Sequence, residues 1–270
     1  MEDPAFPARG SGGVEWTVSA RLESGAPCLR HAFLGRLGGQ SGGLFGSLNL
    51  GPGRGDSAEN VSGNRGRVAQ ALALPREPLT LRQVHGDRVV TVRAGDHDRF
   101  KFTPPEADAY ITALRGVPLM VLTADCLPVV VCDIRTPALG VIHAGWRGTV
   151  LSIVMKTVKA MMEEYGTRPG DCRAAIGPGI RRDCYEVGAE VRDAFERQFP
   201  YSAELFTPTR DGHWNADLKE ANRRQLLDAG IGEGAVNTSS LCTHCGEKRF
   251  FSARRDGIDS GRQGAVAWLE

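Results

Sequence analysis

The stretch Val141-Ile142-His143-Ala144-Gly145-Trp146-Arg147-Gly148 decides how the chain is interpreted. Two β-branched residues lead into His143, and two glycines then bracket a Trp-Arg pair, which is typical of a strand that ends in a tight turn. Residues 149–165 follow with apolar side chains at helical spacing: Leu151, Val154, Met155, Val158, Met161 and Met162. The stretch therefore predicts a strand, a turn and a helix, with a histidine where the strand ends.

Two other segments present side chains that can bind a metal. The apolar run 119–124 stops at Asp125-Cys126 and resumes at residue 129, and His85 follows the shorter run 79–81. Imidazole nitrogens and cysteine thiolates are the preferred ligands of zinc in proteins. Together with His143, Cys126 and His85 would form a site with three protein ligands.

Such a site predicts catalytic chemistry. A zinc ion with three protein ligands keeps a fourth position for water or substrate, and it lowers the pKa of a bound water to about 7. Asp125 and Asp87 lie close in sequence to the ligands, so either carboxylate is a candidate hydrogen-bond partner or proton carrier. The alternative interpretation is that both histidines are polar residues at strand ends and Cys126 is a small buried residue. Spacing alone leaves both interpretations open.

Composition narrows the class of protein. The 270 residues carry a net charge of +1, with 41% hydrophobic and 24% charged residues, as in a soluble globular protein without a field that attracts nucleic acid. Asp125, Cys126 and Pro128 interrupt the longest apolar stretch, 117–133, so we expect no membrane span. The acidic start at residues 1–4 lacks an apolar signal core, which predicts a cytoplasmic protein. We expect no nucleic-acid, membrane or obligatory protein partner.

Short apolar runs predict a mixed fold. The expected strands are 14–21, 31–34, 79–81, 88–92, 109–112, 118–123, 129–133, 139–143, 173–176 and 264–269, and the expected helices are 56–74, 149–165, 189–198 and 216–229. Six strands before one long helix favour an α+β or mixed-sheet fold over regular alternation of strands and helices. Residues 1–13, rich in Pro and Gly, are expected to be a flexible lead-in to a single domain at 14–270.

The C-x-x-C pair near the C-terminus has two competing interpretations, a zinc site or an incidental pair. Cys242 and Cys245 form a C-x-x-C pair around His244, but a four-ligand zinc site needs more ligands, and the spacing of Cys184 and Cys172 does not obviously supply them. We therefore interpret the pair as incidental.

Arginine side chains suggest anion binding. Arg147 opens a helix, where free backbone N–H groups and a guanidinium can bind an oxyanion or phosphate. The alternative is an arginine in water on the first turn. The same choice applies to Arg254-Arg255, where Asp256 can neutralise one of the pair.

Six motifs in chain order resemble the YfiH family. This is also called the laccase-domain or polyphenol oxidase family, and it includes purine nucleoside phosphorylases of the FAMIN type and a peptidoglycan editing factor. The motifs are Gln83-Val84-His85-Gly86-Asp87, Thr123-Ala124-Asp125-Cys126-Leu127-Pro128, His143-Ala144-Gly145-Trp146-Arg147-Gly148, Ile176-Gly177-Pro178-Gly179-Ile180, Cys184-Tyr185-Glu186-Val187 and Phe250-Phe251-Ser252-Ala253-Arg254-Arg255-Asp256. Residues 47–50 and Asn64-Arg65 also fit, so the resemblance covers the chain from about Gly38 to Leu269.

The resemblance implies a fold and an activity. The fold would be an α/β, layered α-β-β-α sandwich with mixed sheets in a single domain, with Zn²⁺ held by His85, Cys126 and His143. The activity would be phosphorolysis of adenosine, inosine, guanosine or S-methyl-5'-thioadenosine to the base and a (methylthio)ribose 1-phosphate, together with deamination of adenosine to inosine. Purine nucleosides and phosphate would be the only partners.

The resemblance also suggests further site residues. Asp125 would carry the proton during deamination, while Arg147, with Arg254 as a second candidate, would seat the phosphate. Asn49 and Arg65 would help to form the substrate pocket.

Other functions stay open at this point. Some family members are described as copper-dependent polyphenol oxidases, and Cu²⁺ also binds Cys and His ligands, although six histidines are too few for a multicopper laccase. A cysteine-type amidohydrolase would use Cys126 as nucleophile and His143 as base on an amide or a peptidoglycan precursor. An accessory role in the cell envelope would involve no nucleoside turnover. Metal content separates the first two, because a bound metal occupies the thiolate.

Overall fold

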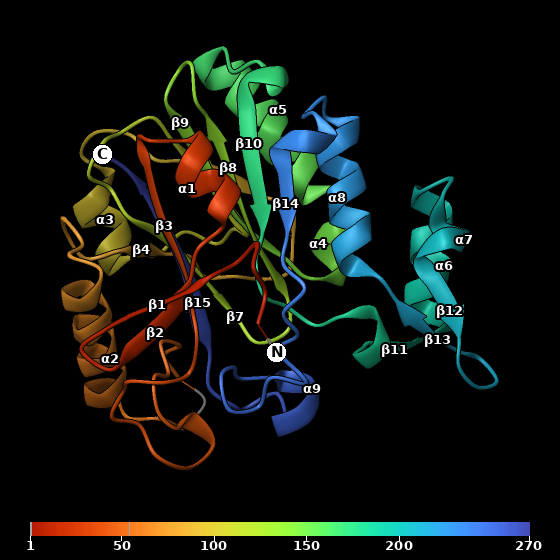
Figure 1. The fold of residues 1–270 in the computed structure, drawn as a ribbon, viewed down its shortest axis with the longest axis horizontal. Helices are drawn as coiled ribbons and strands as arrows, with labels where there is room; N and C mark the ends of the chain where they lie inside the picture. Colours follow the sequence, from red (N-terminus) through yellow and green to blue (C-terminus); the bar gives the residue numbers. More distant parts are fainter. Residues whose placement is uncertain (1, 54) are drawn as a thin grey trace.

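Two six-stranded sheets pack face to face and form the centre of the molecule (Figure 1). The structure is a computed structural model that describes residues 2–53 and 55–270; Met1, the first residue of the expected lead-in, and Arg54, in the glycine-dense segment, lie outside the described residues. The first sheet has the order β1 (Ala8–Ser11), β2 (Val14–Thr17), β3 (Leu29–Leu34), β15 (Gln263–Leu269), β7 (Leu119–Thr123) and β4 (Leu79–Thr80). The second has the order β14 (Val236–Thr238), β10 (Cys172–Ile176), β8 (Leu127–Asp133), β9 (Ala138–Ala144), β6 (Ala109–Thr112) and β5 (Val89–Thr91).

Both large sheets are mixed. In the first, β4 runs parallel to β7 while β15 pairs antiparallel with β3 and β7; in the second, β5 and β14 form the parallel edges. A small antiparallel sheet of β11 (Glu186–Gly188), β13 (His213–Ala216) and β12 (Phe206–Pro208) lies to one side, next to α6 and α7 (Figure 1).

Helices cover the outer faces of the two large sheets. The helices of the described chain are α1 (Ala20–Gly25), α2 (Ala58–Ala71), α3 (Asp96–Phe102), α4 (Trp146–Val150), α5 (Ile153–Tyr165), α6 (Ala189–Gln198), α7 (Ser202–Leu205), α8 (Leu218–Asp228) and α9 (Ala253–Asp256), with short 3₁₀ turns at Gly43–Phe45, Pro169–Asp171, Arg182–Cys184 and Glu233–Ala235. Not all of them cover a sheet face: Leu22 of α1 and Phe100 of α3 enter the core between the sheets. Helix α2 flanks the first sheet, and α5 and α8 lie on the opposite side, over the second (Figure 1). The result confirms the expected layered α-β-β-α arrangement.

Alternation along the strands explains the layers. In β7, Leu119 and Val121 enter the core between the sheets, while Met120 packs outward with Val68 of α2. Because successive strand residues point to opposite faces, a continuous apolar run supplies both sides of a sheet that is covered on both faces. None of the helices in the described ranges has both the length and the apolar character needed to cross a bilayer.

The long helix expected over 149–165 is divided. It forms α4 and α5, because Ser152 between them adopts a left-handed conformation with φ of +61°. Thr149 points inward and is fully buried, and its hydroxyl donates to the Gly145 carbonyl at 2.9 Å. The helix signal from periodicity was therefore correct in type but missed the break.

The N-terminal segment packs onto the fold where we expected a flexible lead-in. Strand β1 pairs antiparallel with β2, and Phe6 is buried in the core between the sheets. The Asp3 carboxylate accepts hydrogen bonds from the Ser239 hydroxyl at 3.1 Å and the Ser240 N–H at 2.7 Å. Composition did not indicate this order, because the partners of Asp3 come from residues 239 and 240, near the other end of the chain.

Candidate metal centre

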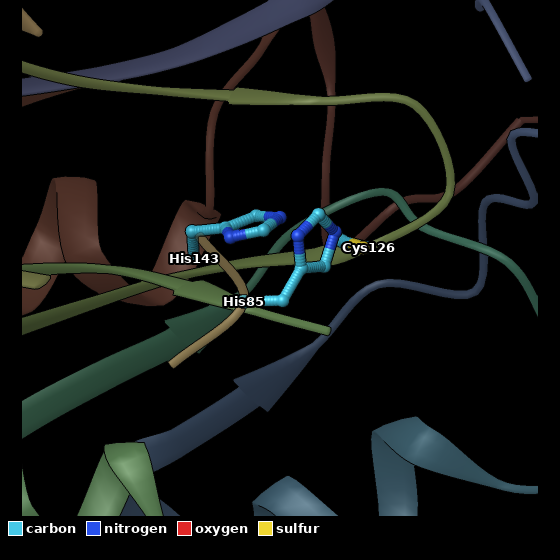
Figure 2. Close-up of side chains that lie close together, drawn as sticks. All are labelled: His85, Cys126 and His143. Carbon is cyan, nitrogen blue, oxygen red and sulfur yellow. The ribbon is translucent and has the colours of Figure 1, made fainter. Parts of the chain in front are cut away.

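Three segments bring the predicted ligands together. His143 lies near the end of β9, Cys126 lies in the turn between β7 and β8, and His85 follows β4. One ligand atom from each of these residues lies within 4.8 Å of the other two. Figure 2 shows the two imidazole rings edge to face beside Cys126, with ring centroids 4.8 Å apart. The structure therefore joins residues that are far apart in sequence into one cluster.

A buried carboxylate, Asp108, organises this cluster. One of its oxygens lies 2.8 Å from Nδ1 of His143 and accepts the backbone N–H of His85 at 3.0 Å. Its other oxygen accepts the N–H groups of Gly86 at 2.7 Å and Val84 at 3.2 Å. A carboxylate that accepts from Nδ1–H fixes the tautomer and leaves Nε2 of His143 as the atom available to a metal.

The loop that carries His85 is fixed from a second side. The Gln83 side chain donates to the Leu122 carbonyl and accepts from the Leu122 N–H, both at 2.8 Å, so it docks the loop on β7. His85 itself has φ of +59°, which turns its side chain toward Cys126 and His143 while the backbone bonds to Asp108. The ring of His85 is exposed, whereas His143 is buried. The cluster thus opens to solvent on the His85 side.

The electrostatics of the cluster favour a thiolate. Burial opposes ionisation of Cys126, but the charge on His143 and hydrogen bonds from His143 and His85 lower the pKa of the thiol to about 6. Burial also opposes protonation of His143, but Cys126 and Asp108 raise its pKa to about 9. In the metal-free protein, Cys126 and His143 therefore form a thiolate–imidazolium pair.

A glycine allows the ligands to approach one another. A Cβ atom at Gly145 would lie 2.9 Å from Cδ2 of His85 and 3.1 Å from Sγ of Cys126. Both distances are tighter than ordinary van der Waals contact, so any larger residue would displace a ligand. This gives a physical reason for the glycine that ends the His-Ala-Gly sequence.

The donor set fits a metal ion. One soft thiolate and two imidazoles suit zinc or copper, and a site with three protein ligands leaves a position for substrate or water. His143 donates its Nδ1–H to Asp108, and metal-bound histidines almost always have such an outer partner. His85, Cys126 and His143 are therefore the residues that would hold the ion.

Asp87 and Asp125 were candidate hydrogen-bond partners of the ligands because they lie close to them in sequence. In the structure, both carboxylates have other partners. Asp87 is ion-paired with Lys156 on the surface, so the hydrogen-bond partner of the ligands is Asp108 instead. Asp125 is buried and accepts hydrogen bonds from the Thr243 hydroxyl at 2.6 Å, the Ser252 hydroxyl at 3.0 Å and the Arg254 N–H at 2.7 Å. Asp125 thereby joins the Cys126 turn to the C-terminal part of the site. Its role as a proton carrier stays a prediction.

Two arginines and a tyrosine line the same region. Burial is the main reason why the pKa of Tyr185 is raised; the charges of Cys126 and Asp125 raise it further, and those of Arg254 and Arg147 lower it. The Arg254 guanidinium lies 5.2 Å from the Tyr185 ring centroid and donates to the Glu186 carbonyl at 2.7 Å. Arg147 lies 4.4 Å from the Trp146 ring centroid, and its side chain is 58% exposed. Arg254 therefore lies against Tyr185 and Arg147 at the start of α4, and a role for either in anion binding stays a prediction.

Asn49 and Arg65 have structural partners. The Asn49 amide donates to the Gly51 carbonyl and the Asp56 carboxylate, and it accepts from the backbone N–H groups of Gly51 and Arg262. Arg65 donates twice to the Leu50 carbonyl, at 3.1 and 2.9 Å. These contacts shape the glycine-dense loop, and a role for both residues in a substrate pocket stays a prediction.

Sequence reasoning missed Asp108 and Tyr185 as functional candidates. Asp108 directly precedes β6 and is fully buried, and a carboxylate next to an apolar strand was the available signal. Tyr185 lies within a motif that we had noted, but its place beside Cys126 depends on the fold.

Comparison with known proteins identifies the family. A family model described as "Multi-copper polyphenol oxidoreductase laccase" matches residues 30–270. A purine nucleoside phosphorylase of Xylella fastidiosa is 40% identical over 228 residues, which cover 83% of this chain and 86% of that protein. Adenosine deaminase RL5, from an unknown prokaryotic organism, is 37% identical over 224 residues, which cover 81% of this chain and 85% of that protein.

A solved structure agrees with these relatives. The crystal structure of Bacillus licheniformis hypothetical protein YfiH superposes with a TM-score of 0.89 at 32% sequence identity, covering 98% of this chain and 99% of that chain. The three metal-binding candidates lie within the residues that the family model matches. The sequence motifs, the layered fold and these similarities lead to one conclusion: the chain belongs to the YfiH family of laccase-domain proteins.

Proposed function

We propose that this protein is a zinc-dependent purine nucleoside phosphorylase that also deaminates adenosine. The observation that carries the proposal is the cluster of His85, Cys126 and His143, oriented by Asp108. The names of the two relatives support the same chemistry, since one is a purine nucleoside phosphorylase and the other an adenosine deaminase. The substrates would be adenosine, inosine, guanosine and S-methyl-5'-thioadenosine.

In phosphorolysis, an oxygen of phosphate forms a bond to C1' of the ribose as the bond from C1' to the purine nitrogen breaks. The base leaves with the electron pair of that bond and takes up a proton. The protein has to hold the dianion beside the sugar, and we assign this role to the exposed guanidinium of Arg147 at the start of α4, with Arg254 beside Tyr185 as the second candidate. Tyr185 would support the base or the sugar through its half-buried ring.

In deamination, a water oxygen forms a bond to C6 of adenine and the amino group leaves as ammonia. A bound Zn²⁺ would supply Lewis-acid polarisation and an acidified water. His85, Cys126 and His143 would hold the ion, and Asp108 would keep His143 in the tautomer that binds it. Asp125 is our candidate for moving the proton to the leaving amino group.

The first test removes the thiolate ligand. We expect Cys126→Ala to lose zinc from this site and to release neither adenine nor inosine from adenosine, because two imidazoles alone hold the ion weakly. Cys28→Ala is the matched control, since it removes a partly buried thiol that lies in neither cluster of metal-binding side chains in the described structure. Elemental analysis and chromatography of the products give the two readouts. A folded Cys126→Ala protein with unchanged zinc content would refute the ligand assignment.

The second test concerns the phosphate seat. Arg147→Ala should raise the KM for phosphate by about tenfold to a hundredfold, because a hydrogen bond to a charged group contributes about 1.5–3 kcal/mol. Deamination, which uses no phosphate, should change little. Arg192→Ala is the matched control, because Arg192 lies 4.4 Å from the Trp214 ring centroid just as Arg147 lies 4.4 Å from that of Trp146. Equal effects of the two substitutions would exclude Arg147 from the phosphate seat.

One observation favours a second candidate function. His143 is hydrogen-bonded to Cys126 on one side and to Asp108 on the other. Cysteine hydrolases have the same arrangement, with a nucleophile, a base and an orienting carboxylate. In that case the metal-free protein would cleave an amide, including one in a peptidoglycan precursor, and alkylation of Cys126 by iodoacetamide would abolish the reaction. Zinc would inhibit this activity, whereas it would support nucleoside turnover.

A further inference from the structure

A second group of soft ligands lies outside the first cluster. Sγ of Cys184 is 3.1 Å from Sγ of Cys245, and the ligand atoms of Cys184, His244 and Cys245 all lie within 4.8 Å of one another. Cys242, the first residue of the same C-x-x-C turn, lies outside this 4.8 Å group, and it is the candidate for a fourth ligand from the neighbouring turn. These residues come from two segments of the chain; Cys184 and Cys245, for example, are 61 residues apart in sequence.

Cys242 begins a tight turn that also carries His244 and Cys245. The Gly246 N–H donates to the Cys242 carbonyl at 3.0 Å and closes the turn. A C-x-x-C turn of this spacing supplies two ligands in many structural zinc sites.

The rest of the fold holds the turn in place without using its ligands. The Arg255 guanidinium donates to the carbonyls of Thr243 at 2.9 Å and His244 at 2.7 Å, while Asp256 pairs with the same guanidinium at 2.6 Å. Gly179 and Cys242 form a parallel bridge that brings the two segments together. The ligand geometry is therefore set by contacts that do not require a disulfide.

We propose that Cys184, Cys242 and Cys245, together with His244, form a second, structural metal site that binds Zn²⁺. Three thiolates and one imidazole form a closed set of four ligands, which is typical of structural rather than catalytic zinc and favours zinc over the harder cations Mg²⁺ and Ca²⁺. Cys184 and His244 are half-buried and Cys245 is exposed, so an ion can enter from solvent. The sequence-based interpretation of the C-x-x-C pair as incidental changes because the fold supplies Cys184.

A metal at the second site would stabilise Tyr185 and Asp125, which belong to the region of the first site. Cys184 precedes Tyr185, and Thr243 between two of the ligands donates its hydroxyl to Asp125 at 2.6 Å. A metal at this place would tie residues 181–185 to residues 242–245 and so fix both groups beside Cys126. Its ligands would be positioning residues, because they act on the site through Tyr185 and Asp125.

Zinc content per folded chain tests the proposal directly. The wild-type protein, purified under reducing conditions with zinc in the medium, should hold about two zinc ions, one for each ligand set. Cys184→Ala and Cys126→Ala should each hold about one, and the Cys184→Ala, Cys126→Ala double variant about none. Cys28→Ala should hold about two. Because each site is removed separately, failure of the second site leaves the proposed function of the first intact.

Cobalt substitution identifies the ligands without reference to activity. In the Cys126→Ala background, Co²⁺ should give a thiolate-to-cobalt charge-transfer band from three sulfurs, and Cys245→Ser should weaken it by about a third. Cys245 is exposed, so this variant provides a folded test if Cys184→Ala is unstable. Zinc content of about one per chain that Cys184→Ala leaves unchanged would overturn the proposal. A disulfide between Cys184 and Cys245, mapped by peptide mass spectrometry of the reduced-purified protein, would also overturn it.

Discussion

Substitution of Asp108 by Asn tests the organisation of the metal centre. The two side chains have the same shape, but the amide replaces one acceptor oxygen by an NH₂ group. In the structure, each oxygen of Asp108 already faces two groups: His143 and the His85 N–H on one side, Val84 and Gly86 N–H groups on the other. Whichever way the amide turns, its NH₂ group must face a backbone donor.

The magnitude follows from these contacts. A buried donor left without a partner costs about 1–3 kcal/mol, so an amide turned toward Val84 and Gly86 would destabilise the fold by about 2–6 kcal/mol. If the NH₂ group turns toward His143 instead, Nδ1 must accept the hydrogen bond, and the ring proton moves to Nε2, the atom that a metal needs. Loss of an outer partner of a metal-bound histidine lowers metal affinity by about 10- to 100-fold.

Two measurements on one protein series examine this prediction. Competition with a chromophoric chelator gives the zinc affinity, measured in the Cys184→Ala background so that the first site is observed alone. Urea unfolding of the metal-free proteins gives the free energy of unfolding. Asp87→Asn is the matched control, because Asp87 follows the same loop but pairs with Lys156 at the surface. A folded Asp108→Asn protein that binds zinc within about twofold of the control would refute the reasoning.

Two further predictions concern packing and pH. Gly145→Ala should lower zinc affinity by about 5- to 150-fold, because its Cβ would lie 2.9 Å from the His85 ring and 3.1 Å from Cys126 Sγ, and overpacking costs about 1–3 kcal/mol; unchanged chelator competition would contradict this. His31 is buried and accepts the Ser19 N–H, and burial lowers its pKa to about 4. Since its unfolded pKa is about 6.5, stability should be complete above pH 6.5 and fall toward pH 4, with about 2 kcal/mol lost by pH 5. Urea unfolding of His31→Gln should show a shallower pH dependence, and equal slopes would exclude His31 as the cause.

Local patterns predicted the elements that position the site. The continuous apolar runs at 119–123 and 139–143 became β7 and β9, because strands between two covered faces are apolar throughout. His85, Cys126 and His143 stood out because each interrupts or follows such a run. The break at Ser152 could not be predicted in this way, because a single residue in the left-handed region leaves the apolar periodicity of the helix almost unchanged.

Contacts between distant segments explain what the sequence did not predict. Asp108 reaches His143 across 35 residues and the His85 loop across 22 to 24, so its role appears only when β6 and β9 pair. Cys184 meets Cys245 for the same kind of reason, because the chain between them forms α6, α7, α8 and the small sheet before it returns. Spacing rules detect ligands within one turn but not ligands from two segments.

The most direct measurement is product analysis of zinc-quantified wild-type protein incubated with adenosine, with and without phosphate. We predict adenine and ribose 1-phosphate in equal amounts when phosphate is present, and inosine whether or not it is present. Adenine, ribose 1-phosphate and inosine should all disappear when the zinc is removed and return when it is restored. A zinc-loaded, folded protein that leaves adenosine unchanged under both conditions would contradict the proposed function.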